Sequence, residues 1–155
     1  MVLAVAAISP AGALGKAKGT DRPLSSTSTG TVVLDLATGA GTAETSGQLS
    51  HLGRITSTVD VTSFTLTGPD TFSFTGTATD VAANGDKLFT TGAATGTLTP
   101  TGTETTTVFT ITGGTGRFAD ASGTGTLRTV GVTVSTVGSI ITSTLTNTSE
   151  GQISY

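Results

Sequence analysis

Short runs in which apolar residues alternate with threonine or serine, separated by glycine, constrain this chain more than any other feature. In the clearest run, residues 129–135, valine occupies every even position, and Phe72 and Phe74 alternate with serine and threonine in the same way. A two-residue period is typical of strands with one buried and one solvated face, which is the antiparallel pattern. Glycine interrupts the windows that are long enough for a good helix. The sequence therefore predicts an all-β protein.

Turn signals divide the chain into strands of the spacing found in barrels and sandwiches. Residues 84–86 (Asn-Gly-Asp) suit a tight hairpin turn, and residues 68–70 (Gly-Pro-Asp) mark another reversal. A closed barrel is favoured over a sandwich, because closure removes the edges that a sheet rich in threonine and valine would expose. We expect a single closed antiparallel β-barrel of about eight strands. The strands are expected near residues 30–37, 49–60, 61–67, 70–79, 86–98, 104–112, 123–136, 139–147 and 150–155.

Composition excludes several classes of protein. The 155 residues suit one domain, and the absence of cysteine excludes a disulfide framework and a cysteine-ligated metal. The net charge is −3 and the basic residues are scattered, so we expect no nucleic-acid partner. With 5% aromatic residues the chain lacks the girdles of an outer-membrane barrel, and we expect no membrane insertion. The acidic residues have no metal-ligand spacing, and we expect neither a metal nor a cofactor.

The N-terminal segment resembles a secretory signal. Residues 1–14 are apolar, precede Lys16 and Lys18, and contain the small-residue sequence Ala-Gly-Ala at 11–13 as a cleavage site. The run is too short to span a bilayer, and the usual basic start is missing. We expect a signal-like and flexible segment over residues 1–29, a barrel domain over 30–155, and a secreted or extracytoplasmic protein. A disordered apolar N-terminus is the alternative.

A glycine-rich run, GGTGRFADASG at 113–123, is the most distinctive motif. It nominally fits the G-x-G-x-x-G/A dinucleotide fingerprint, but a strand follows it where that site needs a helix. The run is similar to the glycine-rich turn of the allene oxide cyclase and dirigent-like barrels. With HLGR at 51–54, ANGD at 83–86 and GQISY at 151–155, the resemblance extends over residues 30–155 to secreted bacterial proteins common in actinobacteria. The matching positions, for which we expect a structural role, are Gly113, Gly114, Thr115, Gly116, Phe118, Ala121 and Gly123.

The resemblance implies an eight-stranded barrel with an apolar interior cavity, often assembled into oligomers, and Phe118 is expected to plug one end. An apolar small molecule and further copies of the chain are therefore the expected partners. The plant enzymes hold a reactive intermediate in the cavity so that a new ring or bond forms with one stereochemistry. Their catalytic residues lie outside the matching motif, so a cyclase-like or dirigent-like enzyme is an alternative function and the catalytic residues are unknown.

Polar residues on apolar strand faces indicate ligand-binding candidates. Arg128 shares the parity of the alternating valines, and His51 and Tyr155 share the parity of nearby isoleucines. If those faces line the barrel interior, these side chains supply an anion partner, a titratable base and a hydroxyl donor. The competing interpretation puts all three at strand ends in solvent.

The favoured function is an extracytoplasmic barrel that binds an apolar small molecule in its interior. Recurrent Thr-x-Thr sequences support a different class, an extracellular structural or adhesion domain without a ligand. An ice-binding plane would need a fixed repeat, and the spacing of these threonines is irregular. We expect them to coat the outer face of the barrel.

Overall fold

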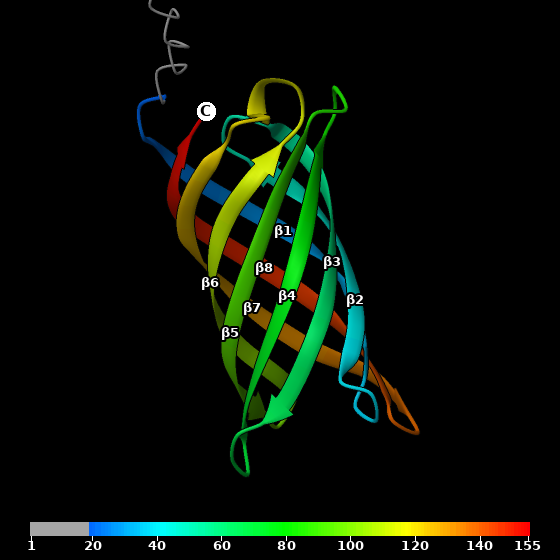
Figure 1. Ribbon diagram of the computed structural model, residues 1–155. Coiled ribbons are helices and arrows are strands. Elements are labelled where there is room, and N and C mark those ends of the chain that lie inside the picture. The colour runs from blue at the N-terminus through cyan, green and yellow to red at the C-terminus, as the bar shows by residue number, and fades with distance from the viewer. Residues whose placement is uncertain (1–18) are drawn as a thin grey trace, which may run out of the picture.

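The structure is a computed structural model that describes residues 19–155. It confirms the predicted fold: eight antiparallel strands follow one another around a closed barrel, and β1 pairs with β8 to complete it (Figure 1). Among the described residues, no helix is long and apolar enough to cross a membrane. The elements are β1 (Arg22–Asp35), β2 (Ala40–Leu49), β3 (Gly53–Leu66), β4 (Thr71–Ala82), β5 (Lys87–Thr99), β6 (Gly102–Gly114), the 3₁₀ turn η1 (Gly116–Phe118), β7 (Ser122–Val137) and β8 (Ile140–Ser154).

The two ends of the barrel differ in construction. At the upper end in Figure 1, the turns after β2, β4 and β6 gather with the chain's last residue. At the lower end lie the hairpin turns after β1, β3, β5 and β7. A closed eight-stranded barrel has an interior that side chains can just fill or that can hold one small ligand. What fills each end therefore decides where a ligand has room.

Apolar packing closes the upper end. The buried cluster there includes Phe118, Leu88, Ile153 and Leu24, and η1 carries Phe118 into it. The glycine-rich turn is tied to the start of β5, because the Thr115 amide donates to the Lys87 carbonyl and the Thr115 hydroxyl accepts from the Lys87 amide, both at 2.9 Å. The packed end resembles a globular core and leaves little space for a ligand.

Glycines inside the barrel make room for aromatic rings on neighbouring strands. Phe72 lies directly opposite Gly96, and Phe109 lies opposite Gly125. A Cβ at either glycine would overlap the facing ring. An aromatic ring that covers a facing glycine is a known way to pack a sheet. A substitution at the glycine should therefore change the packing of the ring that faces it.

The strand boundaries differ from the prediction in three places. β1 begins at Arg22 and not near residue 30, and β3 and β8 are each continuous where two strands were expected. The expected break in β3 coincides with a bulge between Val61 and Ser63. β2 was not expected at all, because its inward positions carry small residues and show no apolar alternation before Leu49. Those inward residues are Gly41, Ala43, Thr45 and Gly47.

The prediction that the alternating valines of β7 mark a buried face is wrong. Val130, Val132 and Val134 are 51%, 46% and 58% exposed, while Gly131 between them is buried. The same parity argument holds for Phe72, which is buried and points inward. Alternation shows that two faces differ, but it does not say which of them is turned to the inside of a barrel.

Candidate functional site

Aromatic and leucine side chains gather inside the lower end of the barrel. We call this region the lower mouth, and its residues are Phe64, Leu66, Phe72, Phe74 and Leu98. The Phe72 ring stacks on Phe64 and Phe74, with centroid distances of 5.2 and 6.4 Å. Leu66 pairs with the inward-facing Phe72 yet is 61% exposed, and Leu98, also at an inward position, is 42% exposed. The lower mouth thus presents an accessible apolar and aromatic surface.

Hydroxyl and amide groups line the barrel between the lower mouth and the packed upper end. The Ser26 and Ser149 hydroxyls are 2.6 Å apart. The Asn147 amide donates to Ser28 at 3.1 Å and accepts from Thr129 at 2.7 Å. We call these five residues the hydroxyl belt. Its groups satisfy one another, as buried polar groups must when water is excluded.

A carboxyl group also points into the barrel. Asp80 lies on the inward face of β4 and accepts a hydrogen bond from Ser57, its direct partner on β3. Burial raises the pKa of the Asp80 carboxyl above its ordinary value of 3.8, and the hydrogen bond from Ser57 opposes that shift. A buried titratable group of this kind is a candidate for function.

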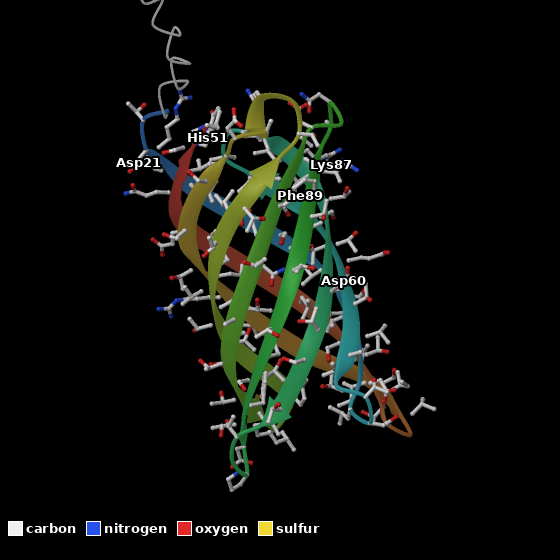
Figure 2. The ribbon with its side chains drawn as sticks, in the orientation of Figure 1. Asp21, His51, Asp60, Lys87 and Phe89 are labelled. Atoms are coloured by element: carbon white, nitrogen blue, oxygen red, sulfur yellow. The ribbon has the colours of Figure 1, made fainter. Side chains whose placement is uncertain are left out.

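His51 and Tyr155 meet at the upper end. Their rings are 5.9 Å apart in an edge-on arrangement, and His51 Nε2 lies 2.8 Å from the Pro23 carbonyl oxygen. Arg22 donates to the Tyr155 hydroxyl at 3.0 Å, and Arg117 donates to the His51 carbonyl. Figure 2 shows His51, Asp21 and Lys87 at the upper end of the barrel. His51 and Tyr155 are half exposed at strand ends, and the Tyr155 ring packs on Phe118 of the buried cluster. They do not line the lower mouth.

Arg128 is separate from that pair, and the parity argument for an interior position fails. It is exposed on the outer wall, because β7 turns its even positions outward as it does for the valines. It lines an open hollow of about 500 Å³ with Thr126, Thr148, Glu150 and Gln152. Charged and hydroxyl-bearing side chains line this hollow, which lies on the outer wall and not inside the barrel.

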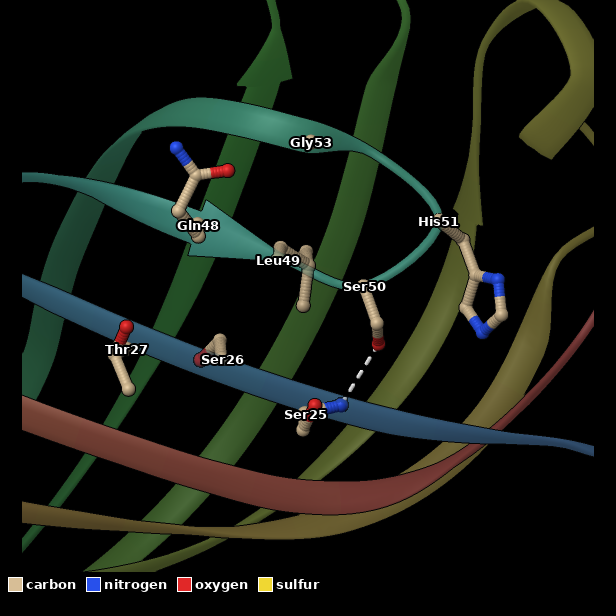
Figure 3. Close-up of a pocket in the computed structure, with 8 residues that line it drawn as sticks. All are labelled: Ser25, Ser26, Thr27, Gln48, Leu49, Ser50, His51 and Gly53. Carbon is tan, nitrogen blue, oxygen red and sulfur yellow. Dashed lines mark hydrogen bonds between the residues drawn. The ribbon is translucent and has the colours of Figure 1, made fainter.

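A second open hollow, of about 420 Å³, lies beside His51 between β1 and β2 (Figure 3). Its outward-facing residues are polar, namely Ser25, Thr27, Gln48 and Ser50. The Ser50 hydroxyl accepts a hydrogen bond of 2.8 Å from the Ser25 amide, which holds the β2–β3 turn against β1. These side chains offer hydroxyl and amide groups for hydrogen bonds, and the hollow is open to solvent.

Sequence reasoning missed most of the lower mouth. The alternation of Phe72 and Phe74 was a signal for two of its rings. Asp80, six residues beyond Phe74, has the same parity, so the sequence alone could have placed its carboxyl group on the inward face of the strand. Phe64 and Leu66 gave no such signal, because the bulge in β3 reverses their parity. Among residues 19–155, no three His, Asp or Glu side chains lie close enough together to hold a metal ion. Comparison with protein-family models, with curated proteins and with solved structures finds no match.

Proposed function

We propose that this barrel binds an apolar small molecule that enters through the lower mouth. The supporting observation is the contrast between its ends: inward-facing Leu66 and Leu98 are 61% and 42% exposed, while inward-facing Leu88 and Ile153 at the upper end are almost completely buried. Apolar surface on the inner side of a barrel gains free energy when a ligand covers it, by about 25 cal/mol for each Å². The lower mouth is therefore where a ligand gains most.

The side chains favour a ligand with a flat or extended apolar body and one polar group. The rings of Phe64 and Phe74 are half-buried and can stack on an unsaturated or cyclic body. The hydroxyl belt and Asp80 lie further inside and supply hydrogen-bond donors and acceptors. A few placed polar groups in an apolar site fix the orientation of a ligand.

The expected location and family are part of this proposal. Residues 1–14, on which the signal resemblance rests, lie outside the described residues. The resemblance to the allene oxide cyclase and dirigent-like barrels implies a closed barrel with a ligand inside it, which is the arrangement proposed here. A cyclase-like or dirigent-like reaction would need the same lower mouth, so ligand binding is the first step to test.

A structural or adhesion domain without a ligand is the second candidate, and the threonine coat favours it. Thr77, Thr91, Thr110 and Thr124 form one row of directly paired outward residues across β4, β5, β6 and β7. Such a row is a regular, uncharged surface. It needs no ligand inside the barrel.

A fluorescence titration of the full chain with the neutral apolar probe N-phenyl-1-naphthylamine tests the proposal. We expect saturable binding at one site, at least tenfold weaker affinity in Leu66→Glu and Leu98→Glu, and unchanged affinity in Val108→Glu. Val108 is the matched control, since it is an exposed residue of the outer wall. Absence of saturable binding, or equal loss in all three variants, would refute the proposal and favour the structural domain.

A further inference from the structure

The exposed valines of β7 belong to a larger apolar area that we call the wall patch. It lies on the outer wall of β7, β8 and β1 toward the lower end and faces away from the lower mouth. Its six members are 38–74% exposed. They are Val33, Val130, Val132, Val134, Val137 and Ile140. The residues between them on β8, such as Thr144 opposite Val132, are uncharged, and one carboxylate, the exposed Glu104 on β6, pairs with Val130 at the edge of the patch. An apolar area of this kind on a soluble domain marks an interaction surface.

The same region has an unpaired strand edge. The pairing of β7 with β6 ends at Val132, opposite Gly102, and one further hydrogen bond joins Thr133 to the Thr101 carbonyl. Beyond the bulge, residues 135–137 pair with β8 alone, and residues 133–137 are all exposed. Figure 1 shows this β7–β8 hairpin projecting at the lower end. The segment contains no charged residue and no proline, which are the usual means of protecting an edge, although a bulge follows Thr133.

Charges of opposite sign lie at the two margins of the wall patch. Arg128 is four residues above Val132 on β7. Asp35 pairs with Ile140, which is four residues below Thr144 on β8. Since Val132 and Thr144 are paired, each charge lies about 13 Å from that row, in opposite directions. Because β8 separates Arg128 on β7 from Asp35 on β1, a two-fold axis that crosses the row obliquely would bring Arg128 of each copy toward Asp35 of the other.

We propose that the wall patch binds a second copy of this chain in an antiparallel, two-fold arrangement. An uncharged apolar centre is self-complementary, and a two-fold axis brings identical residues together without repulsion. The margins then pair a guanidinium with a carboxylate. Covering six such side chains on each copy buries about 1,000 Å² in total, the lower limit for a specific interface.

Sedimentation equilibrium of the full chain tests this proposal. We expect a dimer at about 100 µM chain, where an interface with a Kd of about 1 µM is almost fully occupied. Val132→Glu puts two carboxylates at the axis and is expected to give a monomer, and Arg128→Glu is expected to weaken the dimer at least tenfold. Val108→Glu, an equally exposed valine on β6, should leave the dimer intact.

Other outcomes are equally informative. A monomer at every concentration, or a dimer unaffected by Val132→Glu, would overturn the proposal, as would flotation of the chain with phosphatidylcholine vesicles in place of self-association. Circular dichroism of Val132→Glu and Val108→Glu shows whether both retain the barrel. Leu66→Glu separates this proposal from the proposed function, because it should weaken probe binding at least tenfold and leave the dimer unchanged.

Discussion

The packing of Phe72 on Gly96 gives the sharpest test of how this barrel is built. A Cβ at Gly96 would overlap the Phe72 ring and lie 2.7 Å from the Thr105 Cγ2 atom. Normal contact between carbon atoms is about 3.5–4.0 Å, so the ring must move by about 1 Å. Phe72 is buried and stacked between Phe64 and Phe74, so a shift of its ring disturbs both stacking contacts.

The net effect of Gly96→Ala follows from two opposing terms. Overpacking a buried ring costs about 1–3 kcal/mol. Replacing glycine by alanine also restricts the unfolded chain, which stabilises the protein by about 0.4–1 kcal/mol. We therefore expect Gly96→Ala to lower the free energy of unfolding by about 1–2 kcal/mol. Urea denaturation followed by far-ultraviolet circular dichroism measures it.

A double-mutant cycle identifies the cause. In the Phe72→Leu background the smaller side chain leaves room for the new methyl group, so Gly96→Ala should cost about 1 kcal/mol less than in the parent protein. Phe109→Leu is the matched control, because Phe109 packs on Gly125. Additive effects of Gly96→Ala and Phe72→Leu, or equal coupling to Phe109→Leu, would refute this account of the packing.

Three further predictions concern polar and strained positions. Asp80→Asn should be more stable than the parent at pH 7, because the raised pKa of the Asp80 carboxyl means that its ionisation opposes folding. The parent protein loses stability as the pH rises from 3.8 through the raised pKa. Denaturation curves at pH 3.5 and pH 7 should therefore show the advantage of the variant only at the higher pH. Asn147→Ala should cost about 2 kcal/mol in urea denaturation, since it leaves the Ser28 and Thr129 hydroxyls without their shared partner, and a neutral result would contradict the hydroxyl belt. His51 has a φ of 71°, so His51→Val should lower the free energy of unfolding by about 1 kcal/mol more than His51→Asn, and thermal denaturation of the two variants should separate them.

The candidate site was less predictable than the fold. The sequence placed His51, Arg128 and Tyr155 on apolar faces, and the structure brings together His51 and Tyr155 only, outside the lower mouth. The prediction that Arg128 faces the interior was wrong, because parity does not identify the inner face of a strand. The exposure of Leu66 and Leu98 could not be recognised from the sequence, because exposure at an inward position depends on where the neighbouring strands end.

The sequence by itself determined that this chain is all-β and antiparallel, because period-two alternation, frequent glycine and hairpin turns are local properties. It favoured a closed barrel over a sandwich, and the pairing of β1 with β8 decides that point. Tertiary structure decided the rest. β2 exists because it pairs with β1 and β3, although its inward residues are too small to show a pattern. Which face of β7 is exposed to solvent, and which inward-facing leucines are exposed, depend on strand register and on contacts between distant residues. Those contacts are set when the barrel closes, and no local pattern records them.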